Sequence, residues 1–326
     1  MALQRNLLIF GFLLFPFAAG AQVAAGDLPQ STIWYLHANL EQMRDSSSGR
    51  ELYKWLDGEI FMEIHDEVGI DINKETDAIT AFSDRDQGTV IVVKGNISKD
   101  MQQKLLAIAV LEAKLDTLEY KDQTYYHVYG HRRSAAEEDD EESAEDEADA
   151  ADDMFEDLED SAYFSFATPS KLIITASEKR MEAMLDNHGK IIGSSDHKGA
   201  LFILTADRTF VQAGLRTDRL KDSDDDWESN IIRNTEQAAL LVSGHDDLIA
   251  VEAQLVSSNP KIAESIGGIV NGLISLQAFN SDLDPKIRSL IQNTRVEVND
   301  NVLSVNTVVD PGLVLTVLNN DRSMAE

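Results

Sequence analysis

Two histidines, His127 and His131, are the residues of this chain whose spacing comes nearest to a metal site. They lie four residues apart in the segment Tyr125–His131, whose composition is typical of a strand. At about 3.3 Å per residue, two strand positions on the same face are about 13 Å apart, which is too far for one metal ion. A shared metal would require a turn at Gly130. We therefore interpret the segment as an exposed strand end.

A second candidate for chemistry is the triplet His65, Asp66 and Glu67, which stands in a segment with helical periodicity. A zinc-protease helix needs H-E-x-x-H, with two histidines on one face and a glutamate base. The second histidine is missing, which favours a solvated helix face. The sequence also lacks a G-x-S-x-G elbow, a phosphate loop, a dinucleotide fingerprint and any cysteine. We therefore expect a protein that is not an enzyme, with no cofactor and no metal.

The most unusual stretch is an acidic insert, Glu137–Asp160, in which sixteen of 24 residues are Asp or Glu and none is basic. So many like charges with so little apolar surface predict disorder at neutral pH. Met154, Phe155 and Leu158 interrupt the end of the run with the spacing of one face of a short helix. These three residues are our candidate partner contact.

Three functional interpretations of the insert compete with that of a solvating linker. The leading hypothesis is a salt-sensitive contact for a basic protein partner, because long-range attraction accelerates encounter. The second is weak binding of divalent cations such as calcium, although neither the insert nor Asp222–Glu228 contains an EF-hand array. The third is an intramolecular shield over a basic surface. A hydrolase assembled from distant residues is a further, weaker alternative.

The N-terminus predicts export. Arg5, the apolar run Leu7–Phe17 and the small residues Ala19–Ala21 form a secretory signal over Met1–Ala21. The apolar run is too short for a membrane anchor. A chain without cysteine forms no disulfides, and we expect a periplasmic location, with an extracellular one as the alternative. The net charge of −30 argues against nucleic acid and anionic lipid as partners.

Alternating apolar residues and turn signals predict an opening strand, Ser31–Leu40, a helix over Arg50–Val68 and then a series of hairpins. The predicted hairpin strands are 78–82 with 89–93, 117–120 with 124–129, 162–167 with 171–176, 200–205 with 210–215, 238–243 with 248–256, and 294–298 with 302–309. Helices begin after Ser98 and Ser177 and at Pro260, about 80 residues apart.

These intervals predict a repeated hairpin–helix unit and an α+β fold: an antiparallel sheet with helices packed on one face. We expect a mostly monomeric protein with five parts. They are a signal peptide (1–21), an N-terminal α+β half (22–135), the disordered acidic insert (136–160), a C-terminal α+β half (161–320) and a frayed tail (321–326).

The last long helix contains G-x-x-x-G at Gly268–Gly272, a pattern that lets helices approach closely in lipid. The helix also carries charged and amide side chains, so we do not expect it to span a bilayer. Its apolar residues favour a core face against the sheet, with a membrane or partner groove as the alternative. The predicted core stripe is Ile262, Ile266, Ile269, Leu273 and Leu276.

The segment Val68–Asp71 running into Asp77–Thr80, and Val92–Asn96 before a helix, resemble the front half of a broad group of uncharacterised exported bacterial proteins. The long helix followed by Asp284-Pro285 and a final hairpin is also similar to that group. The resemblance covers most of the mature chain and implies the fold and the exported location. It implies no activity.

Overall fold

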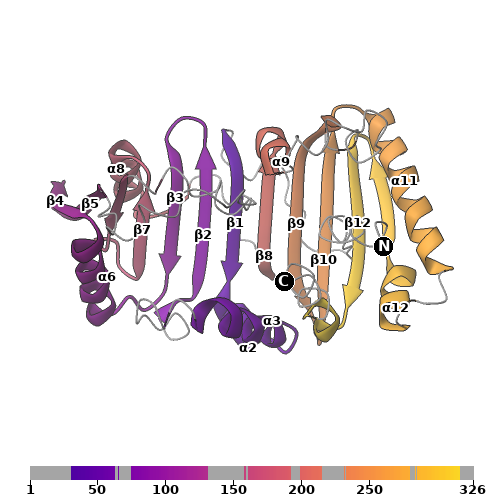
Figure 1. Ribbon diagram of the computed structural model, residues 1–326, viewed down its shortest axis with the longest axis horizontal. Coiled ribbons are helices and arrows are strands. Elements are labelled where there is room, and N and C mark those ends of the chain that lie inside the picture. The colour runs from indigo at the N-terminus through magenta and orange to yellow at the C-terminus, as the bar shows by residue number, and fades with distance from the viewer. Residues whose placement is uncertain are drawn as a thin grey trace, which may run out of the picture.

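The computed structural model describes residues 31–62, 65, 75–130, 158, 161–191, 199–214, 231, 233–279, 283 and 285–315. Within these ranges, twelve antiparallel strands form one continuous sheet, seen in Figure 1. From one edge to the other the strands are β11 (Arg295–Asn299), β12 (Val302–Val309), β10 (Leu248–Ser257), β9 (Thr235–His245), β8 (Ala200–Asp207), β1 (Thr32–Asn39), β2 (Ala78–Asp84), β3 (Gly88–Lys94), β7 (Lys171–Thr175), β6 (Ser161–Ser165), β5 (Gln123–Tyr129) and β4 (Lys114–Tyr120).

The chain reaches this order by running outward and back. The opening strand β1 lies inside the sheet and pairs with β2 on one side and with β8 on the other. After β3 the chain continues to the far edge, forms β4 and β5, and returns through β6 to β7, which pairs with β3. The large antiparallel sheet is therefore confirmed. The order is not that of serially stacked units, and the repeated hairpin–helix unit is not confirmed.

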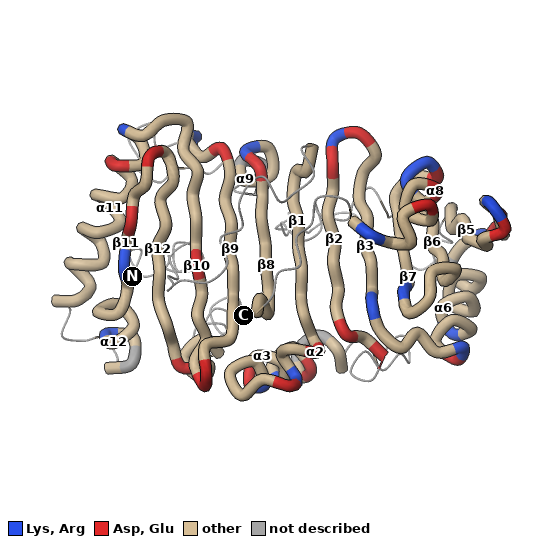
Figure 2. The backbone as a smooth tube through the Cα atoms, turned by 180° about the vertical axis from the view of Figure 1, so that it is seen from behind, with Lys and Arg blue, Asp and Glu red and all other residues tan. Residues whose placement is uncertain are grey.

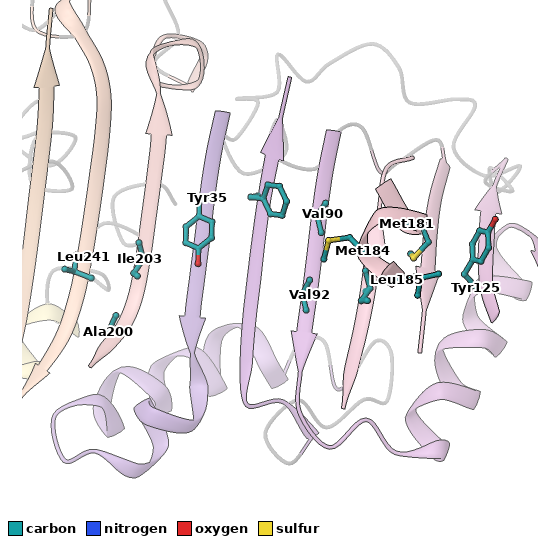
Figure 3. Close-up of a cluster of buried hydrophobic side chains, with 12 residues drawn as sticks. Tyr35, Val90, Val92, Tyr125, Met181, Met184, Leu185, Ala200, Ile203 and Leu241 are labelled. Carbon is teal, nitrogen blue, oxygen red and sulfur yellow. The ribbon is translucent and has the colours of Figure 1, made fainter. Parts of the chain in front are cut away.

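The main hydrophobic core lies between one face of the sheet and helix α8 (Glu178–Asp186). Met181 and Leu185 of α8 are fully buried and belong to the same core as Val90 of β3 (Figure 3). Directly paired residues of antiparallel strands share a face, so Val90 lies on the same side as its partner Phe82. We call this side the α8 face.

The opposite side of the sheet is covered by other helices. Ile266 and Val270 of α11 pack on Leu303 and Val305 of β12. The strand pairing, followed across the sheet, places Leu303 on the side opposite Val90. The prediction of helices on one face is therefore wrong, because a sheet with two apolar faces must cover both. The helices other than α8 are α2 (Leu40–Asp45), α3 (Gly49–Leu56), the π-helical η2 (Asp57–Phe61), α6 (Lys99–Glu112), α9 (Arg208–Gly214), α11 (Pro260–Ala278) and α12 (Pro285–Asn293).

One predicted strand is a helix instead. The segment 210–215 was expected to pair with the strand before it, but α9 occupies Arg208–Gly214. The carboxylate of Asp207 accepts a hydrogen bond from the backbone N–H of Phe210 at 3.1 Å and so caps the first turn. Strand β8 already has β1 and β9 as neighbours, so it has no free edge for the predicted partner.

The predicted core stripe of the last helix is also wrong in part. Ile266 of α11 is buried, as predicted, but Ile269 is 38% exposed and Leu276 is 70% exposed. The side of the helix that contacts the sheet is rotated from the predicted one, and its other buried members, Ala263, Gly267 and Val270, were not part of the predicted stripe. One neighbouring layer covers only one side of a helix, so the rest of the apolar stripe faces outward.

Candidate binding surface at the β4–β6 end of the sheet

The acidic insert connects two neighbouring strands. Strand β5 ends at Tyr129 and β6 begins at Ser161, and these two residues are paired directly across the ladder. The strands that precede and follow the insert are therefore neighbours at one end of the sheet. Of the predicted partner contacts, Met154 and Phe155 lie outside the described residues. Leu158 is described and is a half-buried helical residue.

A row of aromatic rings lies at the base of the insert, on the α8 face. The rings of His127 and Tyr163 are stacked, with centroids 4.2 Å apart and planes 2° from parallel. The ring of Tyr129 lies 4.7 Å from His127 on the same strand. The Nε2 atom of His127 is 2.9 Å from the Oγ of Ser161. The prediction of an exposed strand end is wrong for His127, which is half-buried between these rings; His131 lies outside the described residues.

The edge strand β4 adds one carboxylate and one ammonium group to this row. The hydroxyl of Tyr129 is hydrogen-bonded to the carboxylate of Asp116, and this bond raises the pKa of Tyr129 above its usual value. The Nζ of Lys114 lies 5.7 Å from the centroid of the Tyr129 ring. This distance is that of a cation–π contact, so the ring already holds an ammonium group of its own chain.

Helix α8 borders the aromatic row with three acids. Glu178, Glu182 and Asp186 are spaced four residues apart and so share one side of the helix. The hydroxyl of Tyr125 donates to the carboxylate of Glu178 at 2.6 Å, and the hydroxyl of Tyr120 donates to Asp186 at 3.2 Å. Burial, and then the bond to Glu178, raises the pKa of Tyr125. Tyr125 therefore stays protonated and donates the hydrogen bond that holds the Glu178 carboxylate in place.

At the tip of the β4–β5 hairpin, a lysine of the chain itself is held between a carboxylate and a tyrosine ring. The Nζ of Lys121 donates to the two carboxylate oxygens of Asp186 at 2.7 and 2.9 Å, and it lies 4.6 Å from the centroid of the Tyr120 ring. This hydrogen bond is the main reason that the pKa of Asp186 is lowered. A carboxylate and a tyrosine ring together thus hold one ammonium group at the border of the surface.

Helix α8 is positioned by contacts with the β2–β3 turn. Arg180 forms an ion pair with Asp84, and its guanidinium lies 5.6 Å from the centroid of the Phe82 ring. Ser177, predicted to cap α8, precedes the helix but donates its hydroxyl to the carbonyl of Gln87 at 3.1 Å. These bonds fix the N-terminus of α8 to the sheet and so align its acids with the aromatic row.

We define the aromatic–carboxylate surface as His127, Tyr129, Tyr163, Asp116, Glu178, Glu182 and Asp186. Its carboxylates and ring faces are groups that bind ammonium and guanidinium ions. Sequence reasoning missed it because its members come from four separate elements. The alternation of Tyr125, His127 and Tyr129 on one strand was the available signal, and the cross-strand partner Tyr163 was not readable before the pairing was known.

Next to this surface, Ser161 forms a serine–histidine pair with His127. A nucleophilic serine needs a histidine base, a third group that orients the histidine, and donors for the oxyanion. The neighbouring carboxylate of Asp116 accepts its hydrogen bond from the hydroxyl of Tyr129 and not from the ring of His127. Among the described residues, no three or more His, Cys, Asp or Glu are arranged to hold a metal ion. Of the predicted triplet, His65 is an exposed helical residue, and its two neighbours lie outside the described ranges.

None of the helices in the described ranges is long and apolar enough to cross a membrane. No family model and no curated protein matches the chain. Among solved structures, three crystal forms of a protein named TP0453 are similar, with 10–11% identity. Form IV aligns with a TM-score of 0.47 over 90% of this chain and 95% of that one, and form III with 0.43 over 92% and 99%. At these values the similarity carries no argument about function.

Proposed function

We propose that this chain is an exported, non-enzymatic protein of the bacterial periplasm that binds a basic protein partner. The acidic insert attracts the partner, and the aromatic–carboxylate surface at the base of the insert receives its lysine or arginine side chains. The observation that carries the proposal is the pairing of Tyr129 with Ser161: the strand residues on either side of a segment with sixteen acids belong to the part of the sheet that carries the carboxylates and rings.

Charge and chemistry support this assignment together. The sixteen acids of the insert make up about half of the net charge of −30, so the attraction for a basic partner is strongest at this end. Exposed charges are screened over about 8 Å at physiological ionic strength, so salt weakens the encounter. Lys121 and Lys114 illustrate the short-range contacts that we propose for the partner's lysine and arginine side chains, since each of the two lies over a tyrosine ring beside a carboxylate.

The test is a crosslinking pull-down from a native envelope fraction at low and at high salt. The mature chain is compared with a deletion of Glu137–Asp160 and with the double variant Glu178→Gln, Glu182→Gln. The matched control is Glu264→Gln with Glu297→Gln, which removes the same charge at the other end of the sheet. Circular dichroism establishes that each variant is folded.

We expect a partner that is lost on deletion and at high salt, is weakened by the α8 variant, and is retained by the control. A partner captured equally by all four proteins would show that the insert is a linker and would refute the proposal. Equal losses in the α8 variant and the control would show that overall charge, rather than this surface, is recognised.

Two other functions are separated by simple measurements. Weak calcium binding by the insert predicts heat in calorimetry at millimolar calcium, lost on the same deletion; a flat titration excludes it. A hydrolase using Ser161 and His127 predicts turnover in an esterase and peptidase screen that disappears in Ser161→Ala. The 2.9 Å distance between those two side chains is the observation that makes this second test worthwhile.

A further inference from the structure

The outward side of α11 carries the two most exposed large apolar side chains among the described residues, Phe279 and Leu276, together with Ile269. Phe279 is 88% exposed, Leu276 is 70% exposed and Ile269 is 38% exposed. Phe279 directly follows the helix, and Leu276 and Ile269 precede it by three and ten residues, so all three lie on one side. The sheet is covered by the opposite side of the helix, through Ile266 and Val270.

Two glycines on the same outward side, Gly268 and Gly272, are not required by packing against any other described residue. A Cβ added at Gly268 or Gly272 meets no atom within 4 Å. At the neighbouring Gly267 it would lie 2.6 Å from Cγ2 of Val298, which explains that glycine by the fit against β11. Glycine weakens a helix interior relative to alanine, so two glycines without internal neighbours leave the helix backbone open to close approach from outside.

We propose that the partner on this side of α11 is a second copy of the chain, packed as an antiparallel helix pair. The first reason is charge. The chain has a net charge of −30, yet α11 carries only Lys261 and Glu264 among its 19 residues, so its own net charge is zero. Figure 2 shows most of the length of α11 free of charged residues. Two acidic copies can therefore meet here without bringing their carboxylates together.

The second reason is self-complementarity. Val270 is 1% exposed and points to the sheet. In the proposed pair, a two-fold axis level with Val270 and on the outward side of α11 relates the two helices. This axis places Gly268 of one copy against Gly272 of the other. It also places Lys261, nine residues before Val270, against Phe279, nine residues after it. Lys261 and Phe279 are 18 positions apart in the sequence, which is five helical turns, so both lie on the same outward line.

These pairings give the interface a physical basis. The two glycine pairs let the backbones come close, and each Phe279 ring receives the ammonium group of Lys261 from the other copy. Leu276 flanks the contact and loses its exposure to water. One helix pair is a small interface, so we expect a dimer that dissociates in the micromolar range. The inference is independent of the proposed function and departs from the expected, mostly monomeric state.

The experiment is sedimentation velocity of the mature chain over a concentration series, with three variants. We expect a concentration-dependent dimer whose dissociation constant rises at least ten-fold in Phe279→Ser. The double variant Gly268→Ala, Gly272→Ala is expected to weaken the dimer while raising the melting temperature of the monomer, because alanine favours the helix. The control Leu111→Ser removes a side chain of α6 that is 68% exposed and is expected to leave the dimer unchanged.

A crosslinking test fixes the geometry. The chain has no cysteine, so Ser265→Cys with Ser275→Cys introduces the only thiols. They lie about 15 Å apart along one helix and cannot join within a copy, but the two-fold pairing places them against each other between copies. We expect a covalent dimer on mild oxidation. A chain that stays monomeric and uncrosslinked at all concentrations overturns the proposal. Binding to phosphatidylcholine vesicles that Phe279→Ser abolishes, without any dimer, also overturns it and assigns the surface to lipid.

Discussion

The ion pair between Arg180 and Asp84 gives the sharpest test of how the candidate surface is held in place. The two side chains are 16% and 5% exposed, so both charges are largely removed from water. Asp84 also accepts hydrogen bonds from the backbone N–H groups of Asp86 and Gln87 at 3.0 and 2.8 Å. Replacing Arg180 with methionine keeps the bulk of the side chain over the Phe82 ring but leaves the carboxylate without its counter-charge.

The expected loss follows from this geometry. Breaking a buried ion pair on one side costs about 3–5 kcal/mol, because the remaining charge stays desolvated. For a domain of this size, such a loss lowers the melting temperature by roughly 10 °C. Arg180→Met combined with Asp84→Asn is expected to recover most of the loss, since no charge is then buried alone.

Urea unfolding followed by near-ultraviolet circular dichroism measures these free energies. The matched control is Lys179→Met, the exposed neighbour on α8, which is expected to stay within about 0.5 kcal/mol of the wild type. An Arg180→Met protein as stable as the control would refute the view that this pair anchors α8.

Three further outcomes follow from single positions. Gly95→Ala places a Cβ 1.9 Å from the carbonyl oxygen of Glu75, so we expect a loss of at least about 2 kcal/mol in urea unfolding; an unchanged midpoint would contradict the close approach. Asp122→Gly relieves a positive φ of 62° in the two-residue β4–β5 turn and is expected to raise thermal stability by up to about 1 kcal/mol, whereas destabilisation would argue against the turn. Because Lys121 lowers the pKa of Asp186, their contact stabilises the fold above pH 3.8 and is lost as the pH falls through the lowered pKa. Lys121→Met should remove that acid-dependent step from the fluorescence of the hairpin tyrosines, and a step that persists would assign it to another group.

Most of the strands were readable in the sequence, because alternation and turn residues are local signals. The hairpins flanking Lys121-Asp122 and Asn299-Asp300-Asn301 are formed where they were predicted. The start of α6 was equally local, since Ser98 accepts a hydrogen bond from the backbone N–H of Met101 at 3.1 Å. A prediction failed where a neighbouring element decides the structure. The residues of α9 are apolar and β-branched enough to suit a strand, but β8 already has a neighbouring strand on each side.

The sequence by itself determined the composition of the chain: its acidic insert, its lack of cysteine and the periods of its strands and helices. Only the tertiary structure decided which of these segments contact one another. Residue spacing could not show that Tyr163 stacks on His127, or that Lys121 reaches Asp186 on α8. The two residues of each pair are far apart in the sequence, and the path of the chain between them cannot be predicted from local patterns. Residue spacing also could not show which side of α11 faces the sheet, and so could not predict that Ile266 is buried while Leu276 is exposed. Periodicity fixes which residues share a side of a helix, and the neighbouring layer decides which side is covered.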